Sequence, residues 1–248
     1  NRDELFKKKF DGNEVENHHS HRNFDVNSLI GAIKYFSENG FYVFRMGSNQ
    51  REKLKFTNKK IIDYSFSHNK SDFGDIFLLS NCYMYFGSNS GTVDPAILFG
   101  RYLSYVNFQP SHLHLSNFIK TMPSIIKKIF SLKTGKFLSI KEMYEKKIVG
   151  ISHARVFDRL GYSHTSNTED EITELAKEVV DTINGEISFS HEEREALDKY
   201  YKITNYYNSS ISKGLKSSIR LSKNFLMKNL YLISWHKNLK KLVISLHA

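Results

Sequence analysis

The sequence is poor in three features that would assign a class of protein at once. Its 248 residues include a single cysteine, Cys82, which excludes an internal disulfide and suits a reducing compartment. No run approaches the roughly 18 consecutive apolar residues that span a bilayer, so we expect no membrane-spanning helix. No acidic residue follows Asp198. With 40% hydrophobic and 25% charged residues, the composition is typical of a globular protein, not of a disordered or collagenous one.

The missing acids explain the net charge of +10, which comes from 36 Lys and Arg against 26 Asp and Glu. All the acids lie in residues 1–198, where the basic groups balance them. Residues 199–248 carry ten basic groups and no acid. A basic patch on a folded domain favours nucleic-acid binding. Here the excess of positive charge is confined to the last fifth of the chain, and the rest of the chain is balanced. We therefore expect no nucleic-acid partner, and an RNA-binding protein ranks last among the classes considered.

Residues 26–108 alternate short helical patterns with strand-like runs. Helical spacing of apolar residues follows Asp25, and Ser71 with Asp72 predicts the N-cap of a second helix. Short apolar runs typical of buried strands occupy residues 41–44, 60–64, 82–86 and 102–108. Strands separated by single helices indicate right-handed crossovers. The sequence therefore predicts an α/β fold with a parallel sheet.

The remainder of the chain is expected to be mainly helical. Capping boxes at residues 168–171 and 190–193 predict the starts of two helices, the first of which ends at Gly185. A last helix is expected over roughly residues 211–233, with a basic stripe and an apolar stripe. The chain then divides into a polar segment (1–25), an α/β domain (26–185) and C-terminal helices with a basic tail (186–248).

The turn after the strand at 82–86 is the most informative one. It contains Gly87, Ser88, Asn89, Ser90, Gly91 and Thr92. Small residues at the carboxyl end of a strand let a ligand approach the backbone, and hydroxyls with helix-start N–H groups hold phosphate oxygens. Arg45 follows another strand of the same sheet, so its guanidinium could reach the same anion. An ordinary βα turn and a solvated arginine are the alternatives, and the turn matches neither a P-loop nor a dinucleotide fingerprint.

Several motifs follow one another in the order of a known family. They read YVFRMG at 42–47, SDFGDIFL at 71–78, Cys82, GSNSG at 87–91, LF at 98–99 and VN at 106–107. These stretches resemble the nucleotide-binding half of bacterial GT-B glycosyltransferases, closest to enzymes of surface-polysaccharide synthesis and more distantly to fucosyltransferases. Weaker likeness at 21–23, 137–139 and 167–172 extends the resemblance over most of residues 1–233. Tyr102 stands where the family has proline.

This resemblance implies a Rossmann-like donor domain and the C-terminal half of a two-domain enzyme. Residues 1–3 resemble the end of the element that joins this half to a preceding acceptor-binding half. The implied reaction moves a sugar from a nucleotide-sugar donor to a surface-glycan or lipid-linked acceptor. The alternative function is a non-catalytic nucleotide- or carbohydrate-binding domain.

Sugar transfer expels a diphosphate whose developing charge must be stabilised. GT-A enzymes use a metal held by Asp-x-Asp, which this sequence lacks, whereas GT-B enzymes use arginine and helix N-termini. We therefore expect no metal and no other cofactor. The resemblance assigns the diphosphate to Arg2, Arg45, Gly87, Ser88, Ser90, Gly91 and Thr92. It assigns the nucleoside to Ser71 and Asp72, for which a simple helix cap is the alternative.

The general base that deprotonates the acceptor hydroxyl is expected to be Asp3 or His21, unless the preceding half supplies it. His18, His19 and His21 indicate a surface loop and not a metal site. Adjacent histidines of one loop rarely converge on one ion, and no Cys or acid is spaced to complete a tetrahedral set.

The basic C-terminal helix and its extension, which includes Trp235, have two expected partners. A basic amphipathic helix with a tryptophan binds anionic lipid surfaces. In GT-B proteins a terminal helix commonly packs across the cleft between the halves. The sequence therefore predicts a cytoplasmic protein, peripheral on the inner face of the plasma membrane.

Overall fold

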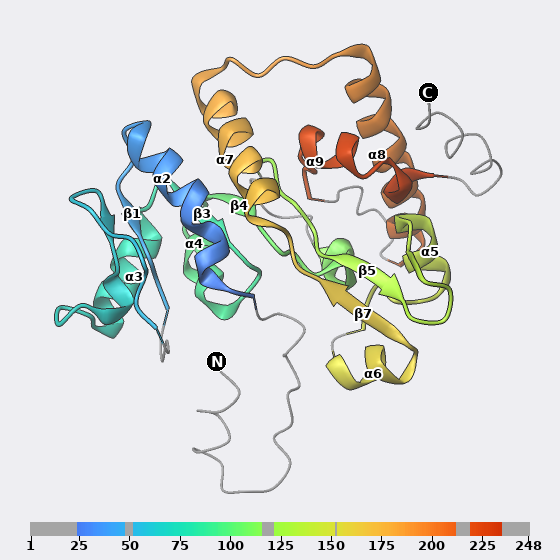
Figure 1. Ribbon diagram of the computed structural model, residues 1–248, viewed down its shortest axis with the longest axis horizontal. Helices are drawn as coiled ribbons and strands as arrows, with labels where there is room; N and C mark the ends of the chain where they lie inside the picture. The colour runs from blue at the N-terminus through green and yellow to red at the C-terminus, as the bar shows by residue number, and fades with distance from the viewer. Residues whose placement is uncertain (1–23, 48–51, 116–121, 152, 212–218, 235–248) are drawn as a thin grey trace, which may run out of the picture.

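The computed structural model describes residues 24–47, 52–115, 122–151, 153–211 and 219–234, which form a mixed α/β fold (Figure 1). The predicted residues Arg2, Asp3, His18, His19 and His21 lie outside the described part of the chain, as does Trp235.

Parallel strand pairs organise the N-terminal part of the fold. β1 (Val43–Phe44) pairs with β2 (Ile61–Ile62), and β3 (Met84–Gly87) pairs with β4 (Tyr102–Tyr105), both in parallel. β1, β2 and β4 fall within the runs that the sequence predicts, and β3 extends one residue beyond its run, to Gly87.

Aromatic rings join the two pairs. The ring centroids of Phe41 and Tyr83 lie 6.3 Å apart, and those of Tyr83 and Tyr102 lie 5.7 Å apart. Phe41 stands just before β1 and Tyr83 just before β3, so this contact brings the starts of the two pairs near each other, while β1–β2 and β3–β4 remain separate two-stranded sheets. Within each pair the strands are parallel, so their carboxyl ends lie at the same edge of that pair.

Helices cover both faces of these strands. α2 (Ile30–Glu38) follows the 3-10 turn η2 (Val26–Leu29), whose N-cap Asp25 accepts the Asn27 N–H at 2.9 Å. The α2 ring of Phe36 packs edge-on against Phe86 of β3 at 5.0 Å. The neighbouring residue of β3, Tyr85, instead contacts Tyr105 and Thr92. Because successive strand residues point to opposite faces, α2 and the helical segment after Thr92 lie on opposite sides.

The parallel pattern continues beyond β4. The N–H of Met122 donates to Leu103 O at 2.8 Å, and that of Ile125 donates to Tyr105 O at 2.7 Å. The N–H of Ser124 in turn donates to Arg220 O at 2.8 Å. Residues 122–127 and 219–222 therefore extend the parallel pairing across the middle of the fold, which the sequence did not predict.

A three-stranded antiparallel sheet is a second unpredicted element. β5 (Lys128–Ser131) lies between β6 (Lys136–Phe137) and β7 (Tyr162–Thr165). These strands have two to four residues, and all four residues of β7 are half-buried. β6 and β7 therefore lack the alternation of buried and exposed residues that indicates a strand in a sequence, and β5 is too short to show more than two alternations. Two short helices accompany them, α5 (Ile140–Glu145), which begins with a capping box at Ser139, and α6 (Ala154–Arg159).

The two long helices confirm their predicted caps. α7 (Glu169–Asn184) begins with the capping box of Thr168 and Glu171, and Gly185 ends it in the left-handed conformation at φ 74°. α8 (His191–Ile211) begins where Ser190 and Glu193 exchange hydrogen bonds, since each accepts the other's backbone N–H.

The continuous helix predicted over 211–233 is wrong for the described residues 219–234. Residues 219–222 are extended and pair with Ser124, and a six-residue helix, α9 (Lys223–Lys228), begins only after the N-cap Ser222. A 3-10 turn, η6 (Leu230–Ile233), follows. The predicted apolar stripe still enters the core through Phe225 and Leu226, but it does so from a short helix.

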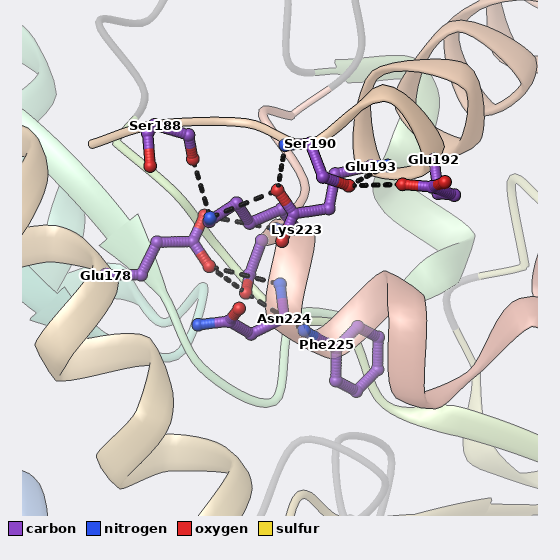
Figure 2. Close-up of polar contacts among 9 residues, drawn as sticks. Glu178, Ser188, Ser190, Glu192, Glu193, Lys223, Asn224 and Phe225 are labelled. Carbon is purple, nitrogen blue, oxygen red and sulfur yellow. Dashed lines mark hydrogen bonds and ion pairs between the residues drawn. The ribbon is translucent and has the colours of Figure 1, made fainter.

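The break at Ser222 is fixed from another helix. Glu178 of α7 is 2% exposed and accepts three hydrogen bonds at the start of α9 (Figure 2). The donors are Ser222 Oγ at 2.6 Å, the Lys223 N–H at 3.1 Å and the Asn224 N–H at 3.3 Å. These bonds satisfy helix-start N–H groups that a continuous helix would have bonded to its own carbonyls.

The Lys223 ammonium adds a second link. It donates to Ser188 O at 2.6 Å and to Glu193 at 3.2 Å, so α9 is joined to the start of α8 as well as to α7. One cluster of buried apolar residues runs from Ala32 to Ile233, so the ranges 26–185 and 186–248 share a core. No helix among the described residues is long and apolar enough to cross a membrane.

Candidate functional site

The predicted glycine–serine turn closes on itself at the carboxyl end of β3. The Tyr85 hydroxyl donates to Ser88 O at 2.8 Å, and the Ser90 N–H donates to the same carbonyl at 2.8 Å. The hydroxyls of Ser90 and Thr92 bond to each other at 2.7 Å. A Cβ at Gly87 would lie 2.9 Å from the Tyr85 hydroxyl, so this tight turn requires glycine there. Gly91 opens the 3-10 turn η4 (Gly91–Val93), which leads into α4 (Asp94–Leu98).

Asn89 connects the turn to the loop that follows β4. Its side-chain nitrogen bonds to Nδ1 of His112 at 2.8 Å, and its oxygen accepts the Gln109 N–H at 3.3 Å. His112 belongs to the 3-10 segment η5 (Pro110–Leu115). The turn after β3 and the loop after β4 thus form one polar edge.

Arg45 ends β1, as predicted, but its guanidinium is engaged on the β2 side. It donates to Asp63 at 3.1 Å and to Glu52 O at 2.7 Å, and its side chain is 7% exposed. Asp63 also accepts the Leu54 N–H at 2.7 Å. The Arg45–Asp63 ion pair joins the end of β1 to the end of β2. Arg45 therefore stabilises the fold, independently of any ligand bound at the carboxyl ends of these strands.

Ser71 and Asp72 stand at the start of α3 (Asp72–Asn81). Ser71 Oγ accepts the Gly74 N–H at 3.0 Å, which confirms the helix cap. Asp72 lies exposed in the first turn of the helix. The nucleoside contact implied by the resemblance stays a prediction for both residues.

Two asparagines from distant motifs meet behind the polar edge. Asn107, just past β4, is fully buried with φ of 50°, a left-handed conformation that asparagine tolerates better than most residues. Asn107 and Asn167 accept each other's backbone N–H groups at 2.7 Å, and Asn167 also donates to Ile126 O at 2.9 Å. The sequence motifs that contain these residues suggested importance but not their contact, because 60 residues separate them.

The same region contains polar groups that sequence reasoning missed. Asn107 Nδ2 and Ser111 Oγ are buried and have no hydrogen-bond partner among the described residues. Lys127 follows the parallel segment 122–126, and its N–H donates to Phe108 O at 2.9 Å, so it lies at the same edge. Lys127 is 2% exposed, and burial lowers the pKa of its ammonium to about 8. Donors such as Asn107 Nδ2 and Ser111 Oγ, when held out of water, can bind an oxyanion.

His164 of β7 is electrostatically coupled to Lys127. Burial, and then the charge of Lys127, lower the pKa of its imidazole to about 4, so the ring is neutral at pH 7. Within the described residues, no group of three or more His, Cys, Asp or Glu side chains could hold a metal ion.

The depressed pKa of His164 predicts a loss of stability in acid. The unfolded chain binds a proton to this histidine near pH 6.5 and the folded chain only near pH 4, so the free energy of unfolding falls as pH drops through that interval. Urea unfolding at pH 7 and pH 5 should show a smaller drop for His164→Gln than for the wild type. His68→Gln, at an exposed position, should behave as the wild type does. An equal drop in all three proteins would contradict this assignment.

Comparisons of this chain with protein-family models, with curated proteins and with solved structures find no match.

Proposed function

We propose that this chain is the donor-binding half of a glycosyltransferase and that it binds a nucleotide sugar, without a metal, at the carboxyl edge of its parallel strands. The observation that carries the proposal is that Asn107 Nδ2 and Ser111 Oγ are buried without a hydrogen-bond partner among the described residues, in the loop that follows β4 and bonds to the glycine–serine turn through Asn89. Buried polar groups without hydrogen-bond partners call for a ligand or a water.

The proposed Rossmann-like, GT-B arrangement has independent support. β1 pairs with β2 and β3 with β4, both in parallel, the residues just before β1 and β3 are in ring contact, and helical segments lie on both sides of β3. In open sheets of this kind, ligands bind outside the carboxyl ends of the strands. The glycine–serine turn leads to a helix there, and its backbone comes within reach of a bound group.

The proposed chemistry is stabilisation of the departing nucleoside diphosphate. Charge accumulates on its oxygens as the bond to the sugar breaks, and donors already fixed in a water-poor site stabilise that charge without reorganising. Lys127 is mostly protonated at pH 7 and supplies the positive charge. Arg45 acts through its link to Asp63, which holds the end of β1 in place. Asp3 or His21 remains the predicted base, and the predicted acceptor is a surface glycan or a lipid-linked sugar.

A thermal-shift panel tests donor binding directly. GDP, UDP, CDP and their sugars are added to the full chain with EDTA present, and the matching nucleosides serve as controls for the diphosphate. At ten times its dissociation constant, a binding nucleotide should raise the free energy of unfolding by about 1.4 kcal/mol. The nucleosides should give a much smaller shift. No response to any diphosphate would reject the proposal, whereas binding without sugar turnover would favour the non-catalytic alternative.

A further inference from the structure

The helices α3 and α4 present a broad apolar surface to solvent. Phe73, Ile76 and Phe77 of α3 are exposed, Phe73 by 76%, and so are Leu98 and Phe99 at the end of α4, Leu98 by 80%. We call these five residues the α3–α4 surface. Ile76, Leu98 and Phe99 also line a groove of about 480 Å³ between the two helices, and Asp94 is among its other lining residues. Single exposed apolar residues are ordinary, but a contiguous group of this kind marks an interaction site.

The pattern of α3 supports a partner on its outer side. Leu79 faces the core, where it is buried, and accounts for the inner side of the helix. Phe73, Ile76 and Phe77 follow the i, i+3, i+4 spacing of a second apolar stripe, and the rings of Phe73 and Phe77 stack at 5.9 Å. A helix that is apolar on both sides is expected to be covered on both sides.

The charges beside this surface are mainly acidic. Asp72 and Asp75 lie in the first turn of α3, and Asp94 begins α4. Asp75 pairs with Lys70, whereas Asp72 and Asp94 form no ion pair with the described residues. The surface therefore suits a partner that is both apolar and basic, and it disfavours an anionic lipid headgroup layer.

The sequence of this protein contains such a partner. Residues 235–248 place Trp235, Leu239, Leu242 and Leu246 at the spacing of one helix face, and Lys237, Lys240 and Lys241 fall on the other side of that pattern. These 14 residues contain no acid, so an apolar stripe flanked by positive charge faces an apolar groove flanked by negative charge.

The distance between the end of η6 and α3 indicates that residues 235–248 reach the α3–α4 surface of a second copy and not that of their own chain. η6 ends at Ile233 and packs against α5 and α8, which lie toward the opposite end of the long axis from α3 (Figure 1). A chain of this length folds to about 36 Å across or more, whereas a 14-residue helix spans only about 21 Å. We propose that residues 235–248 of one copy dock on the α3–α4 surface of a second copy, and that the exchange is reciprocal in a closed twofold dimer.

The single tryptophan makes the docking directly measurable, because Trp235 lies in the docking segment. Sedimentation equilibrium and Trp235 emission are recorded on the full chain over a concentration series. The wild type should dimerise, and its emission should shift to shorter wavelength over the same range as Trp235 enters the groove. The double variant Ile76→Asp/Leu98→Asp should weaken dimerisation by about tenfold or more and keep the emission at long wavelength.

Two controls separate this contact from unfolding and from other surfaces. Leu132→Asp changes another exposed leucine, between β5 and β6, and this variant should dimerise as the wild type does. Asp94→Lys and Lys240→Glu should each weaken the dimer, and their combination should restore it at least in part, because the two charges exchange places across the contact.

Three results would overturn the proposal. These are a wild type that stays monomeric over the whole series, a dimer that Ile76→Asp/Leu98→Asp leaves intact, and a charge exchange that restores nothing. Vesicles of phosphatidylserine and phosphatidylcholine test the lipid alternative. If they shift the Trp235 emission equally in the wild type and in the groove variant while both stay monomeric, the segment binds lipid and the proposal fails.

Discussion

Replacing Glu178 with alanine is expected to lower the free energy of unfolding by about 3 kcal/mol, measured by urea denaturation at pH 7. The carboxylate accepts hydrogen bonds from Ser222 Oγ and from the N–H groups of Lys223 and Asn224. Its loss leaves donors at the buried start of α9 with no acceptor, and it separates α7 from the C-terminal helix. A cavity replaces the missing carboxyl, so water cannot satisfy the donors as well as Glu178 does.

The matched control lies one turn earlier on α7. Glu174 is partly exposed, with 37% of its side chain accessible, and pairs with Lys177 at 2.8 Å, so Glu174→Ala should change the free energy of unfolding by less than about 0.5 kcal/mol. If Glu178→Ala were no more harmful than Glu174→Ala, the link between α7 and α9 would not stabilise the fold.

The contribution of Glu178 to the free energy of unfolding should depend on pH in a defined direction. Burial, the largest influence, raises the pKa of Glu178 above its usual 4.5, although the hydrogen bonds from Ser222 and the backbone oppose that shift. The folded state therefore holds the proton more tightly, and the stabilisation present below pH 4.5 is lost as pH rises through the raised pKa. The advantage of the wild type over Glu178→Gln should accordingly be larger near pH 4.5 than near pH 8.

Replacing Lys127 with methionine is expected to weaken nucleotide-diphosphate binding by about 10- to 100-fold, measured by calorimetric titration with the nucleotide that responds in the thermal-shift panel. The side chain keeps its approximate length but loses the charge that faces the proposed anion.

Lys128→Met is the control for this substitution. Lys128 is the next residue but pairs with Glu171 at 2.7 Å, so its loss should lower stability modestly and leave nucleotide binding unchanged. The affinity of the wild type for the nucleotide should fall as pH rises above about 8, because the Lys127 ammonium of the protein without nucleotide deprotonates there. A Lys127→Met protein that binds as tightly as the wild type would place the diphosphate elsewhere.

The polar edge shows how far local sequence signals extend. The turn after β3 was predictable because small residues and hydroxyls follow a four-residue apolar run, and the caps of α3, α7 and α8 were predictable because each lies within four residues of its helix. Lys127 gave no such signal. It stands in a run of lysines and isoleucines, and only the pairing of residues 122–127 with β4 brings it to the edge and buries it.

Arg45 illustrates the opposite case. Its position at the end of β1 was correctly predicted, but its partner Asp63 is 18 residues away and could not be read from the spacing of motifs. The ion pair exists because β1 and β2 run in parallel, which places both of their carboxyl ends at one edge.

By itself, the sequence determined the alternation of helices and strands over residues 26–108, the caps of the main helices and the confinement of the excess positive charge to the last fifth of the chain. These features depend on neighbours within about one helical turn or one strand. The tertiary structure alone decided the antiparallel sheet of β5 to β7, the meeting of Asn107 with Asn167, and the break before α9 that Glu178 imposes from 44 residues away. Each depends on hydrogen bonds between distant segments, which form only where packing has removed water from both partners.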